Sequence, residues 1–251
     1  MIEKDKNKEI KDISIPYLSD AILEREIKIV LDLMTKSIQM IEKKYESNVI
    51  DPFTTLFEKI IFSDDNNDKW KKKEFQRQLQ KTLANHIGRF HQNLLCSLQD
   101  CKEPDERGTD LICSKKKIFA EIKNKWNSTN ADSLAGSYDK LEKALSSNPT
   151  FKGYFVTIIP NNSENYCTPL ITTKNKKKSQ WRKPRKNIME INAEFFYEKL
   201  TNEKNLLKSI YYRIPNIVKN IDSNKKDLLD NIEKDTSFNY FLLKALGNFE
   251  D

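Results

Sequence analysis

Two carboxylates and a lysine occur in this sequence with a spacing that suits the hydrolysis of a phosphodiester. Asp110 stands directly before the short apolar run 111–113. Glu121 and Lys123 follow a second apolar run, 118–120, and four polar residues (Ser-Lys-Lys-Lys) separate the two runs. Short apolar runs on either side of such a turn predict a hairpin of two antiparallel strands.

The register of this hairpin brings the two acids together. With the turn centred on the Lys115–Lys116 pair, Asp110 falls opposite Glu121, and directly opposed side chains have Cβ atoms roughly 5 Å apart. Because side chains alternate along a strand, Lys123 shares the face of Glu121. Two opposed anions destabilise a hairpin unless positive charge lies between them, so we expect a divalent cation and Lys123 at this point.

The alternative is that an Asp followed by Glu-x-Lys has arisen by chance in a lysine-rich chain. Three features favour a function. Asp110 comes just after Gly108 at the predicted start of a strand, Glu121 and Lys123 continue an apolar strand, and segment 124–130 is a polar loop rather than more core. Two carboxylates with an open side suit Mg²⁺, which binds a few carboxylate oxygens and retains waters and substrate phosphate oxygens.

The same residues carry a resemblance to a known family. Asp110, the string Ala-Glu-Ile-Lys-Asn-Lys-Trp-Asn-Ser-Thr at 120–129, the Tyr-Asp pair at 138–139 and the run 154–160 resemble type II restriction endonucleases of the PD-(D/E)xK superfamily. The branch they resemble cuts interrupted GG/CC sites such as GGNCC. Residues 51–53 and 90–92 are also similar to that branch, and the resemblance covers roughly residues 50–200. Thr109 stands where the nominal pattern has proline, at a position that varies widely.

The resemblance implies a metal-dependent endonuclease that cleaves double-stranded DNA at a short symmetric site. Asp110 and Glu121 then hold Mg²⁺, for which Mn²⁺ can substitute, and the Ile122 carbonyl is a third ligand. Lys123 acts near the attacking water or the scissile phosphate, electrostatically or as a general base. Gln92, on the helix before the Asp strand, is the candidate for a side chain that reaches toward the metal site. Cleavage of both strands calls for two active sites, which a homodimer or two monomers acting in turn would supply, and we expect the homodimer. A cognate DNA methyltransferase would be the genetic partner.

Two segments are candidates for DNA contact. The polar segment after the catalytic strand offers amides and hydroxyls, and the basic segment 172–186 offers lysines that suit phosphates and arginines that suit guanine edges. A solvated run of charge is the alternative for the second segment. The candidate DNA-binding residues are Asn124, Lys125, Asn127, Ser128 and Thr129 in the first segment and Lys176, Lys177, Lys178, Arg182, Lys183 and Arg185 in the second.

The order of the predicted elements indicates an α/β fold. A hairpin, a crossover helix and a buried strand at 154–159 make a mixed sheet between helices. This suits a restriction-endonuclease-like core with added N- and C-terminal helices. We expect a charged, loosely ordered N-terminus at 1–15, the nuclease core with N-terminal helices at 16–202, and a C-terminal helical segment at 203–251 that packs on the core and is interrupted at Pro215.

Composition agrees with a DNA-binding protein. The chain of 251 residues has a net charge of +7, which suits a polyanionic partner, although a lysine-rich proteome would give the same balance. The sequence has no apolar run long enough to span a membrane and no signal peptide, so we expect a cytoplasmic, prokaryotic protein without membrane contact. The four cysteines form no Cys-x-x-Cys pair, so we expect reduced thiols and no zinc site.

Two other functions remain open from the sequence. A structure-selective or repair nuclease could use the same core, and it would prefer branched DNA to plain duplex. A non-cutting DNA-binding protein could keep the fold, but the intact Asp-Glu-Lys set argues against it. Incubation of plasmid DNA with and without Mg²⁺ distinguishes a nuclease from a binding protein.

Overall fold

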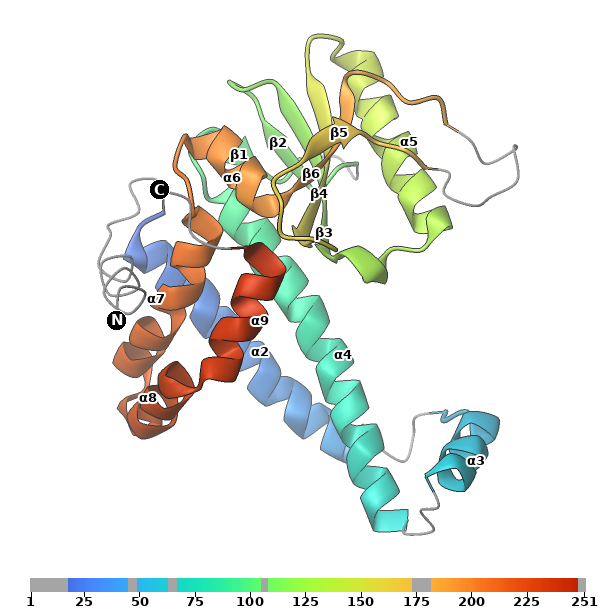
Figure 1. Cartoon of the computed structure of the whole chain (residues 1–251), viewed down its shortest axis with the longest axis vertical. Helices are drawn as coiled ribbons and strands as arrows, with labels where there is room; N and C mark the ends of the chain where they lie inside the picture. Colours follow the sequence, from blue (N-terminus) through green and yellow to red (C-terminus); the bar gives the residue numbers. More distant parts are fainter. Residues whose placement is uncertain (1–17, 45–48, 63–66, 105–107, 173–181, 248–251) are drawn as a thin grey trace. The chain divides into compact units, whose positions relative to one another are not determined.

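The computed structural model describes residues 18–44, 49–62, 67–104, 108–172 and 182–247, and the chain divides into two compact units. One unit comprises segments 1–27 and 90–251 and contains the sheet, and the other, residues 28–89, is helical (Figure 1). The sequence predicts a nuclease core with N-terminal helices over 16–202, and residues 28–89 of that range form a unit of their own in the structure. The expected loose N-terminus, 1–15, lies outside the described residues.

A six-stranded mixed sheet is the framework of the first unit (Figure 1). In chain order, the strands are β1 (Cys101–Lys102), β2 (Leu111–Cys113), β3 (Ile118–Lys125), β4 (Lys152–Ile159), β5 (Cys167–Pro169) and β6 (Ile188–Asn192). Their order in the sheet is β1-β2-β3-β4-β6-β5. The pairs β3–β4 and β4–β6 are parallel and the other pairs are antiparallel, which confirms the expected mixed α/β sheet.

One helix packs on each face of the sheet. Helix α5 (Ala131–Ser147) connects the parallel strands β3 and β4 and contacts both. Helix α6 (Ala193–Thr201) packs on the opposite face, where the ring of Phe196 lies 5.6 Å from that of Tyr154. Cover on both faces explains why β4 is a continuous apolar run, as expected of a strand between two layers.

Gly153 of β4 allows α5 to lie close to the sheet. A Cβ at this position would lie 3.2 Å from Leu145 Cδ1 and 3.3 Å from Leu141 Cβ and Cδ2. Leu141 and Leu145 are buried in the core beside Phe155. The absence of a side chain at Gly153 therefore brings α5, and the polar side chains it carries, near β3.

The remaining helices come before and after these elements along the chain. They are α2 (Asp20–Lys44), α3 (Pro52–Ile61), α4 (Asn67–Cys96), α7 (Leu206–Ile221), α8 (Lys226–Lys234) and α9 (Thr236–Leu246). Helix α3 begins at Pro52, and the Asp51 side chain caps it by accepting the N–H of Phe53 at 2.9 Å. Among the described residues, the structure contains no helix of the length and apolarity that a membrane span requires.

The apolar face of α3 is turned to solvent. Its polar residues Thr55 and Lys59 are partly covered, whereas its apolar residues are more than half exposed. This is the reverse of the usual amphipathic arrangement, in which the apolar stripe packs inward. The exposed apolar residues, which we call the α3 stripe, are Phe53, Leu56, Phe57, Ile60 and Ile61.

The expected interruption at Pro215 is wrong, because α7 continues through it. A proline inside a helix leaves the carbonyl four residues earlier, here that of Tyr211, without its usual donor. Tyr211 is 37% exposed, so this carbonyl lies on a side of the helix that water can reach. The helix ends instead at Asp222, where the backbone is extended.

The expectation of reduced thiols is also wrong for two of the four cysteines. Cys101 of β1 and Cys113 of β2 form a disulfide. The two residues are directly paired across the antiparallel strands, with Cα atoms 4.0 Å apart. Cys96 and Cys167 are free thiols.

Candidate active site

The β2–β3 hairpin has the register that the sequence predicts. Leu111 pairs with Ala120 and Cys113 with Ile118, so the next position in the same register is Asp110 opposite Glu121. The turn is closed by the N–H of residue 117, which donates to the carbonyl of residue 114 at 3.2 Å. The short turn thus fixes the two acids at the open end of the hairpin.

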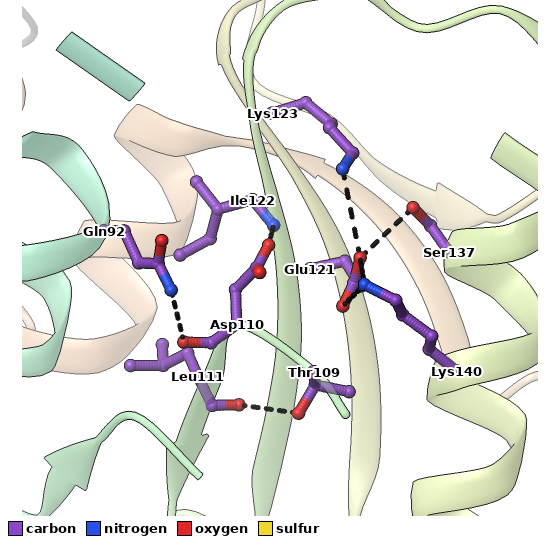
Figure 2. A network of polar contacts seen from close by, with 9 residues as sticks. All are labelled: Gln92, Thr109, Asp110, Leu111, Glu121, Ile122, Lys123, Ser137 and Lys140. Carbon is purple, nitrogen blue, oxygen red and sulfur yellow. Dashed lines mark hydrogen bonds and ion pairs between the residues drawn. The ribbon is translucent and has the colours of Figure 1, made fainter. Parts of the chain in front are cut away.

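Asp110 is held by backbone hydrogen bonds (Figure 2). Its Oδ2 accepts the N–H of Ile122 at 2.7 Å, and its own N–H donates to the carbonyl of Ala120 at 2.9 Å. Gln92 Nε2 donates to the Asp110 carbonyl at 3.2 Å. Gln92 therefore contacts the backbone of Asp110, and the carboxylate is oriented by Ile122.

Glu121 is a fully buried carboxylate between β3 and α5 (Figure 2). Lys140 Nζ lies 3.3 Å from Oε1 and 3.2 Å from Oε2, and Ser137 Oγ donates to Oε2 at 3.2 Å. Lys123 Nζ lies 4.0 Å from Oε2. Ser137 and Lys140, which are three residues apart on α5, were not identified from the sequence, although their i, i+3 spacing puts them on one helical face.

The surroundings of Glu121 disfavour its ionised form. Burial raises the pKa of Glu121, and the neighbouring charge of Asp110 raises it further. Lys140 and Lys123 act in the opposite direction, because positive charge favours the ionised carboxylate. Positive charge added between Asp110 and Glu121 would therefore be stabilised.

The donor set fits a divalent cation that is held by few protein ligands. Within the described ranges, no cluster of three or more His, Cys, Asp or Glu side chains could hold a metal ion, so the acids here are the pair Asp110 and Glu121. In a β-strand, the N–H and C=O of one residue point to the same neighbouring strand. The Ile122 N–H points to Asp110, so the Ile122 carbonyl also lies on the side of β3 that faces Asp110. Two or three protein oxygens leave room for the waters and phosphate oxygens that Mg²⁺ prefers to keep.

The polar candidates for DNA contact lie at the end of β3 and directly after it. Ser128 Oγ donates to the Lys125 carbonyl at 2.5 Å, which tightens the chain directly after β3. The Thr129 hydroxyl is buried and has no hydrogen-bond partner in the part of the chain that the structure describes. The candidates Asn124, Lys125, Asn127, Ser128 and Thr129 lie at the C-terminal end of β3 and in or beside the 3₁₀ helix Trp126–Ser128 that follows.

The basic candidates divide into two groups. Lys176, Lys177 and Lys178 lie outside the described residues. Lys183 is exposed, and its carbonyl accepts the hydroxyl of Tyr138 at 2.7 Å. This bond attaches the described end of the basic segment to α5.

Both arginines of the basic segment are paired with acids of α5. Arg182 makes a two-pronged contact with Asp139, with Nε at 2.6 Å from Oδ1 and Nη2 at 2.8 Å from Oδ2. Arg185 Nη2 lies 2.7 Å from Glu142 Oε1. The hydrogen bonds from Arg182 lower the pKa of Asp139. Contact of either arginine with DNA would require exchange of its acidic partner.

Comparisons with known proteins identify the family of the chain. A model of the Eco47II restriction endonuclease family matches residues 15–223, which include the hairpin, α5 and the basic segment. The chain is 34% identical over 216 residues to the type II restriction enzyme Eco47II of Escherichia coli, covering 84% of this chain and 89% of that enzyme. It is 28% identical over 207 residues to the type II restriction enzyme Sau96I of Staphylococcus aureus, covering 80% and 78%. The chain therefore belongs to the Eco47II restriction endonuclease family.

Proposed function

We propose that this restriction endonuclease hydrolyses phosphodiester bonds of double-stranded DNA at a short symmetric site, with Asp110, Glu121 and Lys123 as catalytic residues. The observation that carries the proposal is the pair of acids opposed on the hairpin, one of them fully buried and with its pKa raised by burial and by the other. Such a pair is unfavourable without added positive charge. Family membership, in turn, does not favour a structure-selective nuclease or a non-cutting binding protein.

A divalent cation, which we propose is Mg²⁺ with Mn²⁺ as a substitute, would be held by the carboxylates of Asp110 and Glu121 and the carbonyl of Ile122. Bound there, it would lower the pKa of a water and neutralise charge on the scissile phosphate. The Ile122 N–H orients the Asp110 carboxylate in advance, and the backbone contact from Gln92 supports the start of that strand. The Asp110 carboxylate is thus oriented before the cation binds.

Lys123 supplies positive charge to the transition state. Its ammonium lies 4.0 Å from Glu121 Oε2, and its side chain is 28% exposed, so it is close to the acids and partly shielded from solvent. Phosphate oxygens gain negative charge during the displacement, and an ammonium at this position stabilises that charge more than it stabilises the bound substrate.

DNA contact is proposed for the residues on either side of this centre. Lys125, the last residue of β3, and Asn127, in the 3₁₀ helix that follows, are exposed, which supports a role next to the cleaved bond. Arg182 and Arg185 would bind phosphate or guanine after releasing Asp139 and Glu142. Arginine forks suit both ligands, because their planar donors match two acceptors at once.

A homodimer would supply one active site for each strand of a symmetric site. The α3 stripe supports this proposal. Its five apolar side chains are each more than half exposed and so present roughly 450–650 Å² to solvent. That area approaches the ~800 Å² that each partner buries in a standard interface. A second copy of the stripe is the occupant we propose, because an isologous interface pairs a surface with itself.

Sedimentation of the full chain tests the dimer. We expect the wild-type protein to be dimeric at micromolar concentration and Phe57→Glu to be monomeric with an unchanged melting temperature, since Phe57 is 61% exposed. Asn85→Glu, which adds the same charge at an exposed position of α4, is the matched control and should stay dimeric. A wild-type protein that sediments as a monomer would exclude this interface. A lower melting temperature of monomeric Phe57→Glu would also exclude it, because the stripe would then pack within one chain.

Digestion of plasmid and phage DNA tests the activity. With Mg²⁺ we expect discrete fragments whose sequenced ends share one short symmetric site, and with chelator we expect none. Asp110→Asn protein prepared in the same way controls for contaminating nucleases. Random degradation, or a preference for branched over plain duplex, would contradict site-specific cleavage. A DNA methyltransferase encoded beside this chain, and able to block the same site, would be the expected genetic partner.

A further inference from the structure

The lysine nearest to the buried Glu121 carboxylate is not the one in the Glu-x-Lys motif. Lys140 Nζ is within 3.3 Å of both carboxylate oxygens, whereas Lys123 Nζ lies 4.0 Å from one of them. Two anions, Asp110 and Glu121, thus face two cations, Lys123 and Lys140. A buried carboxylate is costly without a close counter-charge, and Lys140 is the group that supplies it.

Lys140 and Ser137 hold Glu121 in different ways. The Lys140 side chain is half exposed and carries its charge on a flexible stem, so its ammonium can leave the carboxylate and remain hydrated. Ser137 is 3% exposed, and its hydroxyl donates to Oε2 from a rigid helical position. One contact is therefore exchangeable and the other is fixed.

We propose that Lys140 is the counter-ion of Glu121 in the metal-free enzyme and that it gives up this contact when a divalent cation binds. Ser137 is a positioning residue that keeps the carboxylate oriented in both states. The proposal rests on the proposed metal site at Asp110 and Glu121. Its consequence is that Lys140 competes with the cation for one carboxylate, so Lys140 sets the metal affinity of the enzyme.

Competition predicts effects of opposite sign in Lys140→Met. Without metal, Glu121 loses its closest cation, so the variant should melt at a lower temperature than the wild type. When metal is added, Lys140 no longer competes for Glu121, so the cation should bind roughly tenfold more tightly. A tenfold change corresponds to about one charge-assisted hydrogen bond, reduced because the lysine is half exposed. Metal should therefore raise the melting temperature more in the variant than in the wild type. A purely structural role would weaken folding and metal binding together.

The test measures Mn²⁺ binding to the full chain without DNA, by calorimetry and spin resonance, together with thermal unfolding. Lys140→Gln, which keeps a donor without the charge, should bind Mn²⁺ more tightly than the wild type and be less destabilised than Lys140→Met. Lys143→Met removes the same charge from an exposed position one turn farther along α5, and it should change neither property. Ser137→Ala should weaken Mn²⁺ binding, because it loosens the ligand without removing a competitor.

Glu121→Gln separates the two proposals. If Mn²⁺ binds the wild type and this variant equally, the metal site itself is misassigned and the proposed catalytic centre fails. If Glu121→Gln abolishes binding but Lys140→Met binds Mn²⁺ as the wild type does, or more weakly, the metal site stands and the competition by Lys140 is refuted. Tighter binding by Lys143→Met to the same degree as by Lys140→Met would also refute it, because net charge alone would then explain the effect.

Discussion

Replacing Asp110 by alanine and by asparagine separates its part in the chemistry from its part in the fold. The Asp110 carboxylate accepts the Ile122 N–H at 2.7 Å, and Ile122 is 9% exposed. Alanine leaves this buried donor without its partner, which costs about 1–3 kcal/mol. In a chain of this length each kcal/mol lowers the melting temperature by about 2–4 °C, so we expect a fall of roughly 2–12 °C. Asparagine keeps an oxygen acceptor and should lose less.

Cleavage should fail equally in both variants. Alanine and asparagine each remove the anionic oxygen that would hold the metal, so Mg²⁺-dependent cutting of plasmid DNA should fall by orders of magnitude in single-turnover assays. Metal-free binding to the cognate duplex should persist or tighten, because an anion near the phosphates is gone. Asp132→Asn, which removes a carboxylate from the first turn of α5, is the matched control and should cut normally.

Two results would refute this reasoning. Normal cleavage by Asp110→Asn would show that the carboxylate is not a metal ligand. Equal melting temperatures for the two variants would show that the bond to the Ile122 N–H does not stabilise the hairpin.

Four further outcomes are expected. Lys123→Ala should lower the single-turnover rate by orders of magnitude with little change in DNA affinity, and a loss of affinity alone would make this lysine a phosphate anchor. Burial and the Asp110 charge raise the pKa of Glu121, so the ionised form of Glu121 destabilises the fold. In the presence of a chelator, Glu121→Gln should therefore gain stability relative to the wild type as the pH rises from about 4 to about 7. Thermal unfolding would detect this gain. Gly153→Ala should cost about 1–3 kcal/mol, measured by denaturant unfolding, because its Cβ would press on α5 at 3.2–3.3 Å. Asp139→Asn should free Arg182, raising DNA affinity and steepening its salt dependence by roughly one unit in binding titrations; unchanged binding would mean that Arg182 does not face DNA.

The hairpin could be predicted because everything that defines it is local. Two apolar runs and a short turn fix the pairing, and a one-residue slip would move every side chain to the other face. The register that sets Asp110 against Glu121 is therefore written in about a dozen consecutive residues. The parallel strand β4 followed from its unbroken apolar run and the helix before it.

The contacts made by α5 could not be predicted, because they depend on how a crossover helix lies on its sheet. Helical spacing marks Leu141 and Leu145 as core, but it does not say which strand residue their polar neighbours meet. Ser137 and Lys140 reach Glu121 across 16 and 19 residues of chain. One sequence signal was available, because Ser137 and Lys140 lie beside the buried residues Leu141 and Leu145, which α5 packs against the sheet. The two-residue strand β1, by contrast, carries no signal of its own.

The continuation of α7 through Pro215 has a different cause. Local propensity opposes a proline inside a helix, but the buried face of α7, which includes Ile210, Ile217 and Val218, spans both sides of it. Packing on both sides outweighs one lost backbone bond. Tertiary context of this kind is not visible in a short window of sequence.

Helix α5 contacts two regions that protein engineering would treat as separate, the Glu121 carboxylate and the described end of the basic segment. Ser137 and Lys140 contact the Glu121 carboxylate, while Tyr138, Asp139 and Glu142 hold the chain from 182 to 185. A chimaera that took only segment 182–185 from a relative with another DNA specificity would meet the wrong acids on this helix. Transplanted together with residues 138–142, the same segment would keep its partners. If segment 182–185 contacts DNA as proposed, substitutions there must be matched by substitutions on α5, the same helix that contacts Glu121.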